Sequence, residues 1–308
     1  MTRVGLLRSP LRVIRLFVSL GLLVLLARWL DVRQIAERLG NMQASWVALA
    51  LLLSVVQVVA SAWRWRFTAR RLGIELPFFV ALREYYLAMF LNQVIPGGVV
   101  GDVSRAWRHV RALPPEASSG PAVRAVIIER ASGQVAMAIV ATVSVVSLPF
   151  DETAAWGWTA LAAGAATVGS WFWVRGYTPN ERSVFGRFWQ DARLALFARQ
   201  AFPAQFASSV VVVTTYLLTY VIAARAIGIE TPTFVLLPLV APVLLTMLVP
   251  VTIAGWGVRE STAAVLWGVV GLTAVDGVAI SVAYGLLVLL STIPGGVVLA
   301  VGTGPGRS

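Results

Sequence analysis

The stretch ASWVALALLLSVVQVVASAW, residues 44–63, contains no charged side chain. About 20 apolar residues are enough to cross the hydrocarbon core of a bilayer as a helix. Three further runs of at least 20 residues also lack Asp, Glu, Lys and Arg: 153–174, 200–224 and 277–306. Inside lipid only helices or closed barrels satisfy their backbone polar groups. Because these runs are continuous rather than alternating, they predict helices.

The overall composition agrees with a chain that lies almost entirely in a membrane. Of its 308 residues, 58% are hydrophobic and 13% charged, and the mean hydropathy is +0.80. A soluble domain would have about 25% charged residues. We therefore expect an all-α polytopic membrane protein, with one integral membrane domain over 1–308, approximate halves 11–149 and 153–301, and no soluble domain.

The charged residues exclude several classes of function. The net charge is +11, and all 25 basic residues are Arg. Because they gather at the ends of apolar segments, they indicate contact with a membrane surface and no nucleic-acid partner. The absence of Lys excludes a Walker A motif, and the absence of Cys excludes thiolate metal sites. We expect no metal, no cofactor and a solvated His109, the single histidine.

The positions of the arginines predict the topology. The candidate segments are 11–30, 44–63, 78–104, 125–149, 153–174, 205–224, 233–275 and 277–301. The N-terminal tail, the loop of Arg64, Arg66, Arg70 and Arg71, and the later basic stretches all lie in the cytoplasm if the positive-inside rule holds. This requires 78–104 to enter from the cytoplasm and return to it. The first segment is then an uncleaved anchor.

The sequence therefore predicts that two segments form broken re-entrant hairpins. Segment 78–104 breaks at Pro96-Gly97-Gly98, and segment 233–275 breaks between residues 250 and 257. About six full transmembrane helices remain, and both termini lie in the cytoplasm. Each half then holds three crossings and one hairpin, so the second half is an inverted repeat of the first. Inverted repeats with broken helices at the midplane are typical of secondary transporters.

Candidate functional residues lie in the first hairpin, from Asn92 to Arg105. Pro and Gly stop the entering half-helix, and Asp102 suits the N-cap of the leaving one. Free N–H groups at such a helix start attract phosphate. The alternative is a plain turn with a basic flank. The candidate site residues here are Asn92, Pro96, Gly97, Gly98, Gly101, Asp102 and Arg105.

Two further stretches carry charges beside apolar sequence. Glu129 and Arg130 open a span, and because adjacent helical residues point apart, each needs a partner elsewhere. Asp102 or Glu260 is the expected partner of Arg130; an interfacial pair is the alternative. In the second hairpin the candidates are Gly255, Gly257, Arg259 and Glu260. A charge at the bilayer centre costs about 2.5–3.5 kcal/mol, which favours a functional Arg-Glu pair over an external loop.

These three stretches resemble the lysylphosphatidylglycerol synthase transmembrane-region family, the flippase-like part of the bacterial multiple peptide resistance factor. The similarity rests on Asn92 to Arg105, on Glu129-Arg130 with Gly133, and on Pro250 to Glu260, followed by Pro294-Gly295-Gly296, which we expect to end the last span. The resemblance implies re-entrant helices and translocation of aminoacylated phospholipids between leaflets. The sequence ends at Ser308, so the family's soluble aminoacyl-transferase activity is not expected.

The leading hypothesis is a translocase for a phospholipid or another phosphate-bearing lipid in the bacterial cytoplasmic membrane. Arg105, Arg130 and Arg259 are expected to hold the phosphate, while Asp102, Glu129 and Glu260 orient them or bind a cationic headgroup. Two alternatives stay open: an accessory subunit of an envelope-lipid pathway, and a membrane-embedded transferase acting on a polyprenyl-phosphate. The expected partners are membrane lipids, with a second copy of the chain or a separate lipid-modifying enzyme as further candidates.

Overall fold

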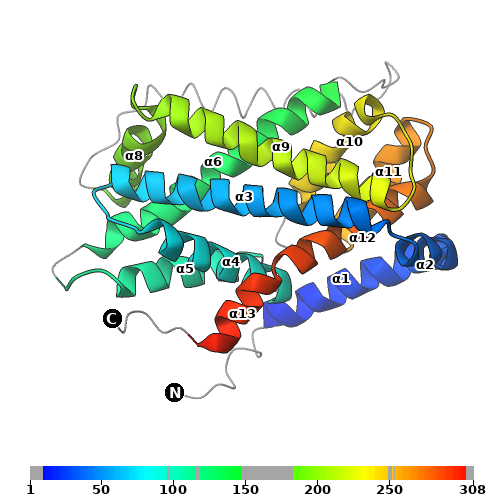
Figure 1. Ribbon diagram of the computed structural model, residues 1–308, viewed down its shortest axis with the longest axis horizontal. Coiled ribbons are helices and arrows are strands. Elements are labelled where there is room, and N and C mark those ends of the chain that lie inside the picture. The colour runs from blue at the N-terminus through cyan, green and yellow to red at the C-terminus, as the bar shows by residue number, and fades with distance from the viewer. Residues whose placement is uncertain are drawn as a thin grey trace.

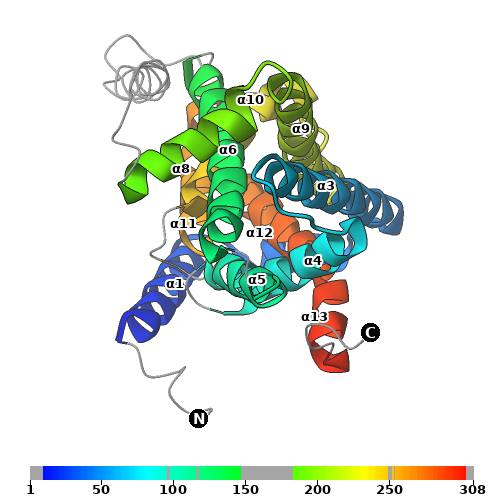
Figure 2. The ribbon, with the colours of Figure 1, turned by 90° about the vertical axis from the view of Figure 1, so that its left-hand side faces the viewer.

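The regular structure is helical throughout the described residues of the computed structural model, which are 10–95, 98–115, 118–146, 183–248, 252 and 254–302 (Figures 1 and 2). The predicted span 153–174 and the acidic pair Asp151-Glu152 lie outside them. The first half contains α1 (Pro10–Trp29), α2 (Val32–Gly40), α3 (Ala44–Arg71), α4 (Phe78–Val94), α5 (Val100–Arg111) and α6 (Ser119–Val146). The second contains α8 (Val184–Ala192), η2 (Arg193–Phe197), α9 (Phe202–Ala226), α10 (Thr233–Leu245), η3 (Thr246–Leu248), α11 (Val258–Val269), α12 (Ala274–Ser291) and α13 (Ile293–Val301).

Within the described residues, four stretches of helix are long and apolar enough to cross a bilayer: α3, α6, α9, and α12 continued by α13. Each is at least 25 residues long, which at 1.5 Å per residue exceeds the hydrocarbon thickness of about 30 Å. Their outer faces keep large apolar side chains exposed, among them Leu52, Val143 and Phe206. Such exposed apolar faces are stable only in lipid or against a partner. The chain is an all-α polytopic membrane protein.

Helices α3 and α9 run antiparallel and define the two ends of the bundle. The backbone N–H of Gln43 donates to the carbonyl of Ala226 at 2.9 Å, and near the other end of the pair Gln205 donates to the Thr68 hydroxyl at 2.9 Å. The second of these ends also contains the ion pair between Arg124 and Asp191. We call it the arginine-rich end, because it gathers Arg70, Arg71, Arg111, Arg124, Arg193 and Arg199. The opposite end contains α2 and the ion pair between Arg38 and Asp276.

The two broken segments enter this bundle from opposite ends (Figure 1). Helices α4 and α5 pack against each other, and α4 starts just after α3 while α5 ends just before α6, both at the arginine-rich end. Helices α10 and α11 follow α9 and precede α12, so their hairpin starts and ends at the opposite end. These half-helices have 12 to 17 residues, too few to span a bilayer fully. The predicted pair of hairpins is therefore present; whether the two halves are repeats stays a prediction.

Three expectations about where helices begin, end or are capped are wrong. Helix α3 continues to Arg71, so Arg64 and the arginines that follow it belong to a membrane helix rather than to a loop. Asp102 does not cap α5, because the N-cap residue is Val99 and Asp102 lies in the first turn. Pro294-Gly295-Gly296 does not end the last span either. Proline is tolerated in the first turn of a helix, and α13 continues to Val301.

Candidate functional site

The tip of the first hairpin is held together by Asn92 at the end of α4. Its side-chain oxygen accepts a hydrogen bond from the Gly101 N–H at 2.8 Å, and its amide nitrogen donates to Asp102 at 3.0 Å. Asn92 therefore satisfies one of the free N–H groups at the start of α5, which is the task that the sequence assigned to Asp102. This link ties the end of α4 to the start of α5.

Glu129, on α6, is the centre of a buried charge cluster. Its carboxylate accepts from Arg64 on α3 at 2.7 Å and from Arg105 on α5 at 3.0 Å, and all three side chains are at most 3% exposed. A buried carboxylate is stable only when cations and hydrogen bonds compensate for its lost hydration. Glu129 thus joins α6 to the preceding helix α5 and to the more distant α3.

Two aromatic rings lie close to the guanidinium group of Arg105. The carbon of that group lies 4.6 Å from the ring centroid of Trp65 and 4.6 Å from that of Tyr85. Asp102 accepts from the same side chain at 3.1 Å. A cation in contact with two aromatic rings and two carboxylates suits the broad guanidinium group of arginine better than the ammonium of lysine. The side chain is 1% exposed, so its main contacts are with the protein itself.

Arg130 differs from its neighbours because it faces open space. It pairs with Asp102 at 2.8 Å and donates to the carbonyl of Gly98 at the hairpin tip at 3.3 Å. Asp102 is thus its partner, as one of the two sequence-based expectations had it. The side chain is still 36% exposed. Arg130 lies 11 residues into α6, or about 17 Å from its start, which places it near the middle of the bundle.

A second buried ion pair stands at the start of α11. Arg259 donates to Glu260 at 2.6 Å, and Ser281 on α12 bonds to both side chains at 2.9 and 3.0 Å. Glu260 also accepts from the Gly257 N–H at 2.7 Å. Here two adjacent residues do pair, because both side chains bend over the first turn of the helix. With exposed fractions of 1% and 0%, this pair fixes the second hairpin against α12.

A cavity of about 210 Å³ lies between the tips of the two hairpins. Gly98 contributes from the first hairpin, and Met247 and Ala254 from the second. Many of its other lining groups are polar: Ser54, Gln57, Arg64, Tyr85, Asn92, Gln93, Glu129, Arg130, Gln134, Tyr216, Thr219, Tyr284 and Ser291. A hollow lined this way in a bundle with apolar outer faces favours a hydrated or charged ligand.

The structure separates the predicted site residues into two groups. Asn92, Gly98, Glu129 and Arg130 line the cavity. A further seven do not line it and instead shape or support the hairpins: Gly101, Asp102, Arg105, Gly255, Gly257, Arg259 and Glu260. Pro96 and Gly97 lie outside the described residues. The fold thus gathers the described candidates around the two hairpins, and the division into cavity-lining and supporting residues required the tertiary structure.

Several cavity residues were not predicted. Arg64 was assigned to a loop, and the tyrosines on α4, α9 and α12 carry no pattern that separates them from interfacial ones. Gln57 could have been noticed in the sequence, since it is the polar residue with the longest side chain in the apolar stretch 44–63.

His109 does not line the cavity, and the expectation that it is solvated is wrong. Its side chain is 6% exposed, and its ring lies 5.3 Å from that of Trp65.

Comparison of the sequence with known protein families gives a match over most of the chain. A family model described as the lysylphosphatidylglycerol synthase TM region matches residues 12–295, which include both hairpins, α6 and most of the spans. The chain belongs to this family. The resemblance inferred from the three motifs is therefore confirmed. No curated protein matches the chain. Membership in the lysylphosphatidylglycerol synthase transmembrane-region family supports a membrane location and a role connected with membrane lipids.

Proposed function

We propose that this protein translocates a phosphate-bearing lipid between the leaflets of the bacterial cytoplasmic membrane. The observation that carries the proposal is the polar cavity between two hairpin tips that enter from opposite ends of the bundle. A headgroup in this cavity is reachable from either leaflet if the two tips move in turn. At about 210 Å³ the cavity is too small for acyl chains as well, so they stay in the bilayer.

The charge of the site favours an anionic group. Around the cavity stand three guanidinium groups, of Arg64, Arg105 and Arg130, and two carboxylates, of Asp102 and Glu129. The cluster therefore carries one excess positive charge, which a lipid phosphate would neutralise. Arg130 is the side chain placed to bind it, because its guanidinium is partly exposed at the cavity. Arginine binds phosphate oxygens through paired N–H donors.

In this proposal the remaining charged residues have a supporting role. Arg105 is buried against two aromatic rings and Arg259 is paired with Glu260, so neither reaches the phosphate directly. They hold the hairpin tips in place on either side of the cavity. The arginine-rich end faces the cytoplasm under the positive-inside rule, which places both chain termini there as well.

Lipid exchange in proteoliposomes tests the function. Purified protein is reconstituted with phosphatidylglycerol that carries a fluorophore on one acyl chain, and dithionite quenching reports movement between leaflets. We expect exchange well above that of empty liposomes. Arg130→Ala should slow it by about tenfold or more, since a hydrogen bond to a charged group contributes roughly 1.5–3 kcal/mol. Arg33→Ala, which alters an exposed ion pair on α2, is the control and should exchange at the wild-type rate.

Two results would overturn the proposal. In the first, both phosphatidylglycerol and its aminoacylated form exchange no faster than in empty liposomes. The protein would then be an accessory subunit rather than a translocase. Exchange at the wild-type rate by Arg130→Ala would remove the central cavity from the transport path.

A further inference from the structure

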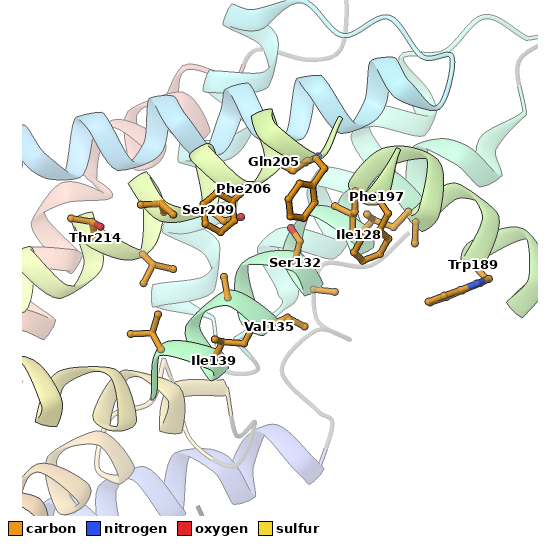
Figure 3. A pocket seen from close by; sticks show the side chains of 18 of the residues that line it. Ile128, Ser132, Val135, Ile139, Trp189, Phe197, Gln205, Phe206, Ser209 and Thr214 are labelled. Atoms are coloured by element: carbon orange, nitrogen blue, oxygen red, sulfur yellow. The ribbon is translucent and has the colours of Figure 1, made fainter. Parts of the chain in front are cut away.

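A second hollow, separate from the central cavity, opens on the outer face of the bundle between α6, α8 with η2, and α9 (Figure 3). Its volume is about 520 Å³, and its walls are largely apolar. Phe206, Val210 and Ile139 line it and are 61%, 49% and 40% exposed, so the hollow is an open groove. Helices α6 and α9 are both long apolar spans, so the groove faces the hydrocarbon core.

The groove runs along the helices for about the depth of one leaflet. On α6 its lining extends from Ile128 to Val140, which at 1.5 Å per residue is about 18 Å. A single leaflet contributes about 15 Å, half of the roughly 30 Å hydrocarbon thickness. Both α6 and α9 start at the arginine-rich end, and on α9 the lining begins at Phe202, the first residue of that helix, so the groove opens at the leaflet on that side. Its length and lining suit an acyl chain of a bilayer lipid.

One end of this groove is polar in a way that an acyl chain alone does not explain. Gln205 and Trp189 both line the groove and are 5% and 6% exposed. Among the residues that the structure describes, the Gln205 Oε1 and the Trp189 Nε1 have no hydrogen-bond partner. The amide orientation of Gln205 is fixed, because its nitrogen donates to the Ala195 carbonyl at 3.2 Å, which can only accept. Buried polar atoms without partners are costly, so a bound polar group is expected there.

Positive charge lies beside the same end. Arg193 starts η2, a single turn of π-helix, a feature found frequently at functional sites. Together with Leu194, Phe197 and Ala198 it forms a smaller hollow, and Phe197 also lines the groove. Arg187, Arg193 and Arg199 are all exposed along this segment. Basic residues at a membrane surface attract anionic lipid headgroups.

We propose that this groove binds an anionic glycerophospholipid from the leaflet at the arginine-rich end. The acyl chain fills the groove between α6 and α9. An ester carbonyl of the lipid accepts from the Trp189 N–H, and a headgroup hydroxyl or a water that it carries donates to Gln205. The phosphate lies against Arg193. This site is separate from the central cavity, since α6 and α9 stand between them, and it does not depend on the translocase proposal.

Photo-crosslinking tests the site directly. The protein is reconstituted in nanodiscs with either phosphatidylglycerol or phosphatidylcholine, each carrying the same photoactivatable acyl chain, and labelled peptides are mapped by mass spectrometry. Phosphatidylglycerol should label residues 128–140 and 202–217 at least threefold more than phosphatidylcholine does. Val210→Trp fills the groove and should reduce that label several-fold. Val211→Trp is the matched control, because Val211 is similarly exposed at 43% but does not line the groove.

Two further variants separate the parts of the proposed contact. Arg193→Gln should abolish the preference for phosphatidylglycerol while leaving the label itself. Trp189→Phe should weaken labelling by an ester-linked lipid and leave labelling by its ether-linked analogue unchanged. Arg130→Ala should label like the wild type, so loss of translocation and loss of this site are distinguishable.

Three outcomes would overturn the proposed site. One is equal labelling of the groove and of other bilayer-facing positions such as Leu52. Another is equal labelling by the two lipids. The third is a crosslink that joins the groove to the apolar residues 153–174 of the chain itself in place of a lipid.

Discussion

At the scale of single residues, Glu129 provides the negative charge that compensates buried arginines inside the membrane. Its two carboxylate oxygens bind guanidinium groups from two other helices, at 2.7 and 3.0 Å. Gly133, one turn further along α6, has a matching role. A Cβ at this position would lie 2.9 Å from the Arg64 Nη2, so a larger residue would require the buried guanidinium to shift from its present position. The cluster therefore needs both the carboxylate and the gap beside it.

Replacing Glu129 with Gln should strongly destabilise the protein. The change leaves two buried arginines without their shared counter-charge, and breaking a buried pair in this way costs about 3–5 kcal/mol. Glu37→Gln is the control, because it removes an exposed pair with Arg33 worth about 0–1 kcal/mol. Circular dichroism during titration with a denaturing detergent measures the difference in free energy of unfolding.

The double variant Glu129→Gln, Arg64→Met tests whether the cost comes from the pair. Because one unpaired cation is removed together with its partner, the two effects should be clearly less than additive. Full additivity would mean that Glu129 and Arg64 stabilise the fold independently, contrary to the structure.

At the scale of elements, the hairpin helix α4 is held by glycines on two neighbours. A Cβ on Gly101 of α5 would lie 1.9 Å from the Ala88 carbonyl oxygen, and one on Gly295 of α13 would lie 2.1 Å from that of Tyr86. Small residues let membrane helices approach closely enough for their backbones to touch. Glycines that sequence analysis associated with the hairpin break and with a helix end are therefore packing positions.

We expect Gly101→Ala to loosen the first hairpin. The added methyl group meets backbone atoms that cannot rotate away, so α4 and α5 must separate. Gly268→Ala is the matched control in the second hairpin: it lies within α11 with no atom in the way, and helix propensity favours alanine by about 1 kcal/mol. Thermal unfolding in detergent should show a lower midpoint for Gly101→Ala and an unchanged or higher one for Gly268→Ala. An unchanged midpoint for Gly101→Ala would contradict the close packing.

At the scale of the whole molecule, the two hairpins meet in the middle from opposite ends. The cavity between them is lined by Gly98 from one and by Met247 and Ala254 from the other. Each hairpin is braced by its own buried ion pairs, centred on Glu129 and on Glu260. This gives two half-width elements around one polar space, each tied to the long spans by buried charges.

Cysteine labelling in intact cells tests this topology, and the chain has no native cysteine to remove. Glu75→Cys and Ser118→Cys flank the first hairpin, and both positions are exposed at the arginine-rich end. Glu230→Cys and Thr273→Cys flank the second and are exposed at the opposite end. A membrane-impermeant maleimide should label the second pair and not the first. Labelling of only one member of either pair would mean that the segment crosses the membrane.

The sequence by itself determined the membrane class, the family and the approximate positions of both hairpins. Each of these depends on local properties: the length of an apolar run, a Pro-Gly break, the order of three motifs. The sequence also allowed the partner of Arg130 to be predicted. A charge inside an apolar bundle needs a counter-charge, and few acidic residues lie near apolar segments.

Only the tertiary structure decided which charged groups face the cavity. Arg64 lies 65 positions before Glu129, and no periodicity in the sequence connects them. Whether an arginine is buried against aromatic rings, like Arg105, or partly exposed at the cavity, like Arg130, depends on how the helices pack. The lateral groove has the same origin, since packing of α6, α8 and α9 buries the Gln205 Oε1 and the Trp189 Nε1, which have no hydrogen-bond partner among the residues that the structure describes.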